Sequence, residues 1–307
     1  AQAILAQVAQ DSRALPKQFY HFVDIYLKPT SHRGMVHLFV LAAAFAVLVE
    51  GANRTVVVTG ATGRSGSDTY LLLKKAGVNV RGLVRSTSKA KQVLGCSKCD
   101  ESEGIFVGDI TKPESMVPAM TGADGLVITT GAASGESAKD ILFDGVANQV
   151  SVFLTSPGPK PEERHVSMIS MQFTTLSDTF LNKIIAHLWG GWDVGFYSLQ
   201  GEANLMSSNV PFTILKACGL TDSPAKEDKV LVGHDDKGWS MKDAHTVSRH
   251  DVARVLAAAS ANPSMAKGLR FDICSTKGQP QVEAMDIIKE AMQPWDPRKT
   301  QSVVTVV

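Results

Sequence analysis

The chain of 307 residues is poor in aromatic side chains and in net charge. Aromatic residues make up 7% of it, and the formal net charge at pH 7 is +1. A nucleic-acid-binding protein normally carries a clustered basic excess, so this balance argues against that class. Apolar residues make up 44% of the chain, which is enough for a substantial core in one large domain or two smaller ones.

Cysteine is also scarce. Cys96 and Cys99 form a lone Cys-x-x-Cys, while Cys218 and Cys274 stand far apart in segments that we expect to be core. No second pair of ligand residues accompanies the Cys-x-x-Cys. The sequence therefore favours free thiols in a reducing compartment over a zinc site or thiol redox chemistry, and we predict no metal site.

Residues 1–53 contain no recognisable part of a nucleotide-binding fold, and we interpret them as an N-terminal extension before a domain at 54–307. Within the extension, Met35 to Val49 holds His37 as its one polar residue. As a helix this segment would be about 22 Å long, at about 1.5 Å per residue, which is short of the roughly 30 Å hydrocarbon core of a bilayer. The chain begins at Ala1, which fits a processed or trimmed precursor.

Three interpretations of residues 35–49 stay open: a membrane-spanning helix, a buried helix, and an uncleaved signal-like segment. The uniform apolar character favours the membrane, because a helix packed on one side should show a polar face. His37 could bind a pigment or a metal, or could simply lie at the membrane interface.

The clearest motif in the chain runs from Thr55 to Gly66. Four β-branched residues, Thr55 to Val58, suit a strand that is buried on both faces. Gly60, Gly63 and Gly66 follow at intervals of three, and an apolar helical segment comes next. Such glycines permit a tight turn, the approach of backbone to a pyrophosphate, and packing of helix on strand. The sequence predicts a dinucleotide-binding turn with the phosphate at the helix N-terminus.

From Arg54 onward apolar strands alternate with helical stretches, the pattern of an α/β fold with a doubly wound parallel Rossmann sheet. We expect a small C-terminal part after this sheet, and the hydrophobic helix at 35–49 before it. The segment 177–197, broken by Trp189-Gly190-Gly191-Trp192, is expected to be irregular, as a lid or a partner surface. The predicted strands are 55–58, 78–84, 105–107, 126–130, 165–171, 211–217, 229–232 and 268–274, and the predicted helices are 67–76, 113–120, 140–153, 196–207, 250–261 and 282–292.

Three features at strand ends bear on the cofactor. Arg85 follows the second strand with no acid beside it, which favours the 2′-phosphate of NADP over the 2′-hydroxyl of NAD, although a merely solvated arginine is an alternative. Asp109, at the end of the third strand, could meet the adenine or could cap the next helix. The small residues at 131–135, beyond the fourth strand, would leave room for the nicotinamide.

Together these segments resemble the atypical short-chain dehydrogenase/reductases. The run Val-Val-Val-Thr-Gly-Ala-Thr-Gly-Arg-Ser-Gly at 56–66 carries the resemblance, with further matches at 82–86, 106–111, 124–128, 181–183, 211–220 and 231–236. More narrowly, the chain is similar to the plastid NAD(P)-binding, NmrA-like branch that includes the NADP-binding component of the chloroplast import machinery. The resemblance covers about residues 54–277 and implies bound NADP(H). The cofactor-binding residues that it implies are Gly60, Thr62, Gly63, Arg64, Ser65, Gly66, Arg85, Asp109, Ile110, Thr130 and Gly131.

The catalytic pattern of this superfamily is a serine after the fifth strand and a Tyr-x-x-x-Lys on the next helix, where the lysine lowers the pKa of the tyrosine. Ser170 stands at the serine position and Tyr197 is the tyrosine near that helix, so these are the catalytic candidates. Four residues after Tyr197 the chain has Gly201 in place of lysine.

Two other features could stand in for the missing pair. A Tyr-x-x-x-Lys occurs at Tyr70 and Lys74, but it falls on the helix after the glycine turn, and we interpret it as chance. Lys183 or His187 could replace the lysine, although polar residues on an irregular segment are the simpler interpretation.

Three functions follow as hypotheses. The first is an NADP(H)-binding accessory or regulatory subunit of a plastid membrane complex of the thylakoid, tethered by residues 35–49 with its domain in the stroma. The second is an active NADPH-dependent reductase of a small carbonyl or quinone-like substrate. The third is a soluble redox sensor whose apolar helix is core. The absent lysine and the N-terminal extension favour the first.

Overall fold

The computed structural model describes residues 54–174, 192–225, 228–236, 245–277 and 282–292. The predicted apolar helix at 35–49, His37, Lys183 and His187 lie outside these ranges. Within them, none of the helices combines the length and the apolar character that crossing a bilayer requires.

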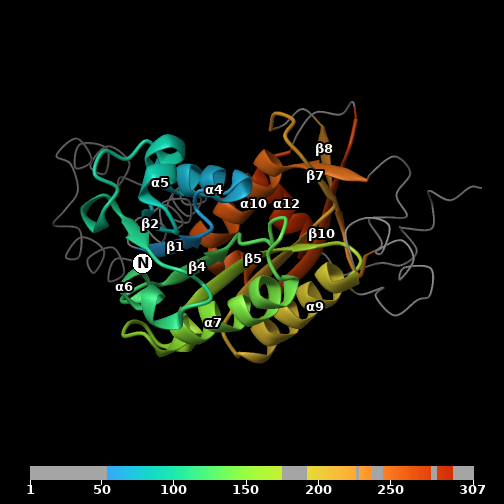
Figure 1. The fold of residues 1–307 in the computed structure, drawn as a ribbon. Helices are drawn as coiled ribbons and strands as arrows, with labels where there is room; N and C mark the ends of the chain where they lie inside the picture. The colour runs from blue at the N-terminus through green and yellow to red at the C-terminus, as the bar shows by residue number, and fades with distance from the viewer. Residues whose placement is uncertain (1–53, 175–191, 226–227, 237–244, 278–281, 293–307) are drawn as a thin grey trace, which may run out of the picture. The chain divides into compact units, whose positions relative to one another are not determined.

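The core of the fold is a sheet whose strands run parallel in the order β3-β2-β1-β4-β5-β6-β10 (Figure 1). The order reverses between β1 and β4, which is the switch point of a doubly wound sheet. The parallel Rossmann arrangement predicted from the sequence is confirmed. These strands are β1 Thr55–Thr59, β2 Asn79–Val84, β3 Ile105–Val107, β4 Gly125–Ile128, β5 His165–Met171, β6 Phe212–Ala217 and β10 Leu269–Thr276.

Beyond β6 the sheet is mixed. β8 (Lys229–Gly233) and β9 (Thr246–Ser248) both pair antiparallel with β10, and β7 (Gly219–Thr221) pairs parallel with β9. β7 and β9 were not among the predicted strands. They extend the sheet on the side away from β3, so the C-terminal part continues the sheet rather than forming a separate layer.

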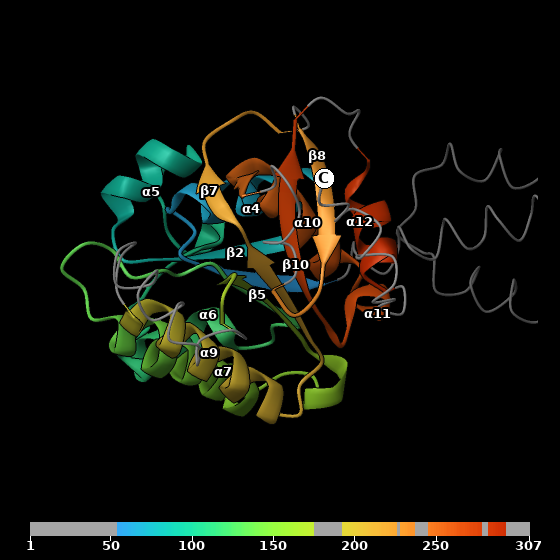
Figure 2. The same cartoon turned by 90° about the vertical axis from the view of Figure 1, so that its right-hand side faces the viewer.

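Helices cover both faces of the sheet. Helices α4 (Arg64–Lys75), α10 (Arg249–Ala261) and α12 (Ala284–Ala291) lie on one face, and α7 (Gly145–Thr155) and α9 (Trp192–Ser207) lie side by side on the other (Figures 1 and 2). Each face has its own apolar core.

The first strand shows why its sequence is so uniformly apolar. Val56 and Val58 belong to the core beneath α4 and α10, whereas Val57 belongs to the core on the opposite face. All three are fully buried. A strand covered on both faces has no polar side, so alternation disappears.

Several helices differ from their predicted bounds. Helix α5 (Thr87–Leu94) was not predicted, and α9 begins at Trp192 instead of 196, so part of the segment expected to be irregular is helical. The stretch 113–120 is a 3₁₀ turn, Pro113–Met116, that continues as α6 (Val117–Met120). A π-helical turn, Lys139–Asp144, precedes α7. The last two helices, α11 (Pro263–Ala266) and α12, flank β10 in the sequence.

The cysteines are paired. Cys96 and Cys99 form one disulfide, and Cys218 and Cys274 form another. The expectation of free thiols therefore differs from the structure, because sequence spacing could not show that Cys218, at the end of β6, and Cys274, in β10, meet across neighbouring strands.

Candidate dinucleotide-binding site

The glycine turn after β1 closes on itself. Gly60 has a left-handed φ of 68°, and its carbonyl oxygen accepts a hydrogen bond from the Gly63 amide at 2.7 Å. A Cβ on Gly66 would lie 2.1 Å from that same carbonyl oxygen. Side chains are therefore excluded from both ends of the turn, as close packing of helix on strand requires.

Helix α4 starts directly at this turn. Its N-cap is Gly63, and no side chain caps its first amide groups. Uncapped amides and the helix dipole favour an anion at this end. The turn and the helix start thus fit the pyrophosphate of a dinucleotide.

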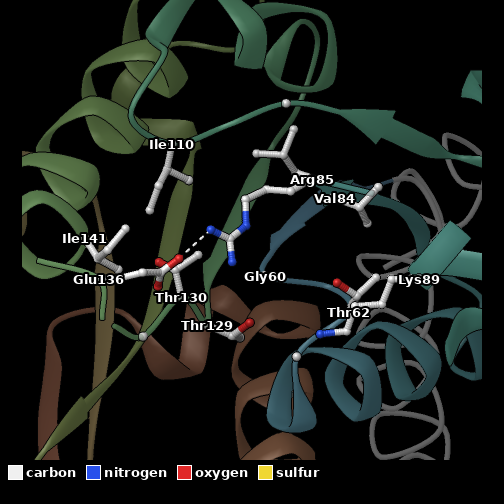
Figure 3. Close-up of a pocket in the computed structure, with 14 residues that line it drawn as sticks. Gly60, Thr62, Val84, Arg85, Lys89, Ile110, Thr129, Thr130, Glu136 and Ile141 are labelled. Carbon is white, nitrogen blue, oxygen red and sulfur yellow. Dashed lines mark hydrogen bonds and ion pairs between the residues drawn. The ribbon is translucent and has the colours of Figure 1, made fainter. Parts of the chain in front are cut away.

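A pocket opens beside the turn at the carboxyl ends of β1, β2, β3 and β4 (Figure 3). This is where doubly wound folds bind ligands, outside the strand ends at the switch point. The lining residues are Gly60, Thr62, Gly63, Leu83, Val84, Arg85, Lys89, Gly108, Ile110, Thr129, Thr130, Gly131, Glu136 and Ile141.

Three charged side chains line this pocket: Arg85, Lys89 and Glu136. The Arg85 guanidinium contacts the Glu136 carboxylate at 2.6 Å, as the dashed line in Figure 3 marks. The hydrogen bond to Glu136 raises the pKa of Arg85, and the backbone N–H of Ala133, followed by Arg85, lowers the pKa of Glu136. Lys89, from the unpredicted helix α5, lines the same pocket. The pocket wall therefore carries two cationic side chains.

Asp109 does not cap the next helical turn, whose N-cap is Lys112, and it holds the loop before that turn instead. Its carboxylate accepts hydrogen bonds from the Thr111 amide at 2.9 Å and the Thr111 hydroxyl at 2.8 Å, and the amide is the main cause of its lowered pKa. Asp109 thus fixes the turn after β3, and its neighbours Gly108 and Ile110 line the pocket.

The pocket brings together seven of the eleven predicted cofactor residues: Gly60, Thr62, Gly63, Arg85, Ile110, Thr130 and Gly131. Arg64, Ser65, Gly66 and Asp109 do not line it. Arg64 instead pairs with Asp222 at 3.2 Å, and Ser65 and Gly66 are buried in the first turn of α4. Lys89 and Glu136 were not among the predicted site residues, because Lys89 lies on an unpredicted helix and Glu136 lies in a loop without a motif.

The catalytic candidate Ser170 belongs to a buried polar cluster at the end of β5. Its hydroxyl donates to the carboxylate of Glu202, which is fully buried. Glu202 also accepts from Thr174 at 3.0 Å and pairs with Arg270 at 2.6 Å. The cluster satisfies the glutamate with three donors, and it commits the Ser170 proton to Glu202.

Gly201, which stands where the Tyr-x-x-x-Lys pattern has its lysine, serves helix packing. A Cβ on Gly201 would lie 2.2 Å from the Leu142 carbonyl oxygen, so α9 packs directly on the backbone of the π-helical turn. Tyr197, one turn earlier on α9, is half-buried, and its ring meets that of Phe196 edge to face at 5.2 Å. A lysine has no room at this position.

The Tyr70 and Lys74 pair is part of the core packing of α4. Tyr70 is buried, and its ring lies where a side chain on Gly82 of β2 would project. The Lys74 ammonium lies 5.9 Å from the centre of the Tyr70 ring. Neither residue lines the pocket.

Among the described residues, Cys96, Cys99 and Glu103 form a group with metal-ligand chemistry. The two sulfurs are bonded to each other, and the Glu103 carboxylate accepts the amides of Ser97, Lys98 and Cys99 at 2.7 to 3.1 Å. Its donor atoms are therefore engaged within the protein.

Comparison with known proteins agrees with this geometry. The NAD(P)H-binding family profile matches residues 60–263. Sanguinarine reductase of Eschscholzia californica is 28% identical over 239 residues, covering 67% of this chain and 83% of that protein. The chloroplastic protein TIC 62 of Pisum sativum is 23% identical over 277 residues, covering 82% of this chain and 49% of that protein.

An uncharacterised chloroplastic protein of Arabidopsis thaliana is 29% identical over 225 residues, which cover 67% of this chain and 65% of that protein. The chain thus spans about half to two thirds of the length of these chloroplast relatives.

Solved structures show the same fold. A protein described as an NAD-dependent epimerase/dehydratase of Bacillus halodurans superposes with a TM-score of 0.58 at 17% identity, over 78% of this chain and 100% of that one. A short-chain dehydrogenase/reductase of Veillonella parvula, solved in complex with NADP, gives 0.54 at 18% identity, over 72% and 94%. The plant relatives agree with the predicted resemblance to the plastid branch of the atypical short-chain dehydrogenase/reductases. The glycine turn, the pocket at the strand ends and the profile match lead to one assignment: the chain belongs to the NAD(P)H-binding family.

Proposed function

We propose that this protein binds NADP(H) and serves as a cofactor-carrying accessory or regulatory subunit of a plastid membrane complex. The observation that carries the cofactor choice is that two cationic side chains, Arg85 and Lys89, line the pocket. Arg85 and Lys89 would hold the 2′-phosphate, the start of α4 would hold the pyrophosphate, and Thr130 and Gly131 would border the nicotinamide. When bound, the cofactor supplies a hydride donor or acceptor.

Two observations support a binding role over catalysis. The Ser170 hydroxyl donates to the buried Glu202, and the position of the family lysine is Gly201, which packs against the Leu142 carbonyl oxygen. The usual serine, tyrosine and lysine arrangement is therefore not assembled from these residues. The described residues of the pocket suit cofactor binding, but they do not include the tyrosine and lysine pair that acts as proton donor in this superfamily.

Titration calorimetry with NADPH and NADH tests the cofactor choice. In Arg85→Glu the preference for NADPH should fall by at least about tenfold, because a cation that lines the pocket is replaced by an anion facing the 2′-phosphate. Lys75→Glu makes the same charge change on an exposed residue at the far end of α4 and serves as the control. An unchanged preference in Arg85→Glu would refute the assignment of Arg85.

Chloroplast relatives support a plastid location, and the apolar segment 35–49 supports a membrane tether with the domain in the stroma. Extraction of plastid membranes with alkaline carbonate tests the tether. The full chain should stay in the membrane pellet, and a chain lacking residues 35–49 should move to the supernatant. Release of both chains would eliminate the anchored arrangement.

A second candidate function is an NADPH-dependent reductase of a small carbonyl or quinone-like substrate. The relative described as sanguinarine reductase and the intact pocket favour it. Consumption of NADPH in the presence of quinones or aldehydes, lost in Ser170→Ala or Tyr197→Phe, would support this candidate. Turnover absent across these substrates, with NADPH still bound, would support the binding role.

A further inference from the structure

Glu136 stands out in the pocket because both of its carboxylate oxygens are engaged. One accepts the Ala133 amide of its own loop at 2.9 Å, and the other contacts the Arg85 guanidinium at 2.6 Å. Figure 3 shows the two side chains reaching toward each other across the pocket from opposite walls. The loop after β4 is thus tied to the end of β2 by a pair of side chains that both line the cofactor pocket.

The Glu136 carboxylate thus occupies the Arg85 guanidinium, the group that would bind the phosphate of the ligand. The inference rests on the proposed function, in which Arg85 binds the 2′-phosphate of NADP(H). A phosphate forms bidentate, charge-assisted hydrogen bonds with a guanidinium as a carboxylate does, and it carries up to about two negative charges where the carboxylate carries one. The Arg85 side chain is 66% exposed and that of Glu136 is 27% exposed, and ion pairs at the protein surface contribute little stability, so a ligand can break this pair.

The same carboxylate also suits the other cofactor. In dinucleotide folds an acidic side chain accepts a hydrogen bond from the ribose 2′-hydroxyl of NAD, and a cation receives the 2′-phosphate of NADP. Here the acid comes from the loop after β4 rather than from the end of β2, where the sequence offers Arg85. The pocket therefore holds one determinant for each cofactor, and each neutralises the other.

We propose that Glu136 is a specificity-determining residue of this site: it occupies Arg85 until a 2′-phosphate displaces it. Binding of NADP(H) breaks the Arg85–Glu136 ion pair, and the loop of residues 133–136 is then no longer tied to β2. NAD(H) binds with this ion pair intact. Glu136 thereby weakens NADP(H) binding and reduces the difference in affinity between NADP(H) and NAD(H).

Glu136→Gln tests this directly, because glutamine keeps an oxygen for the Ala133 amide but loses the charge. Titration calorimetry should show NADPH binding tightened about three- to tenfold, with NADH binding unchanged or weakened. Adenosine 2′,5′-bisphosphate should gain affinity as NADPH does, and adenosine 5′-monophosphate should not. Glu162→Gln, in the turn before β5 and outside the pocket, is the matched control.

Hydrogen exchange gives a second readout in the unmutated protein. NADPH should raise exchange of the Ala133 to Glu136 amides relative to NADH, because it frees the loop. NADPH affinity that is unchanged or lower in Glu136→Gln, or equal protection of the loop by both cofactors, would overturn the proposal while leaving NADP(H) binding intact. If the unmutated chain binds neither cofactor, the proposed function itself fails.

Discussion

Gly66 lies so close to the preceding turn that one methyl group decides whether the turn can close. In Gly66→Ala the new Cβ would be 2.1 Å from the Gly60 carbonyl oxygen, and backbone would have to shift. We expect a loss of about 1–3 kcal/mol in unfolding free energy and no measurable NADPH binding in calorimetry. Ser67→Ala, the next residue on α4, should leave both near their original values.

His165 is a second residue whose surroundings fix its chemical state. The Thr213 hydroxyl donates to the Ala266 carbonyl at 2.7 Å, so its oxygen accepts from the His165 Nε2–H at 3.0 Å. The other ring nitrogen lies 3.5 Å from the Ser167 hydroxyl. Burial, together with the charge of Arg54, lowers the pKa of His165 to about 3. The ring is therefore neutral in the folded protein.

This lowered pKa makes stability depend on pH. An unfolded histidine has a pKa of about 6.5, so below that pH the unfolded chain binds the proton and the folded chain does not. The contribution of His165 is complete above about pH 6.5 and falls by up to about 1.4 kcal/mol per pH unit as the pH drops toward 3. Urea unfolding at pH 7.5, 6.5, 5.5 and 4.5 measures the slope. His165→Gln should be less stable at pH 7.5 but lose less on acidification; parallel curves for the two proteins would contradict this.

At the scale of elements, helix α9 owes its position to a glycine contact. The Gly201→Ala Cβ would meet the Leu142 carbonyl oxygen at 2.2 Å, so α9 must move away from the π-helical turn. We expect a loss of about 1–3 kcal/mol in unfolding free energy by chemical denaturation. Gly195→Ala on the same helix meets no atom within 4 Å and should stabilise it by about 0.5–1 kcal/mol.

The same contact predicts that restoring the family lysine does not restore catalysis. Gly201→Lys recreates the Tyr-x-x-x-Lys sequence motif, but the lysine side chain would be directed at the backbone of residues 139–144. The variant should lose stability and show no new NADPH oxidation with aldehydes. A gain of reductase activity would show that α9 can turn this face toward the pocket.

How far the sequence predicts these elements depends on how they are buried. The continuous apolar run of β1 and the glycine spacing after it exist because the strand is covered on both faces, and both were predictable. Helix α5 buries only Ala90 and Leu94, so it leaves almost no periodic signal. β7 and β9 have three residues each and depend on pairing with each other. Lys89 was not predicted because it lies on α5, and Glu136 was not predicted because it lies in a loop without a motif.

At the scale of the whole molecule, a buried ion cluster joins the parallel sheet to its C-terminal extension. Lys216 on β6 lies in register with Asp272 on β10, with the ammonium 3.5 Å from the carboxylate, and it also pairs with Asp236 after β8. All three side chains are fully buried. Two carboxylates and one ammonium thus connect three parts of the sheet that are remote in sequence.

Removal of the ammonium tests this connection. Lys216→Met would remove the buried ammonium that both carboxylates contact, and we expect a loss of about 3–5 kcal/mol in unfolding free energy. Lys112→Met, on an exposed loop residue, is the control and should change stability by less than about 0.5 kcal/mol. A loss below about 1 kcal/mol in Lys216→Met would mean that the cluster is not a stabilising element.

The position of β10 governs how the chain can be made. It lies inside the sheet, between β6 on one side and β8 and β9 on the other, although it follows all of them in the sequence. A nascent chain that has not yet released Leu269–Thr276 from the ribosome therefore presents the open edge of β6, whose backbone groups can pair with another chain. Synthesis intermediates that stop before Leu269 should aggregate or bind chaperones, and the sheet can close only after Thr276 has emerged.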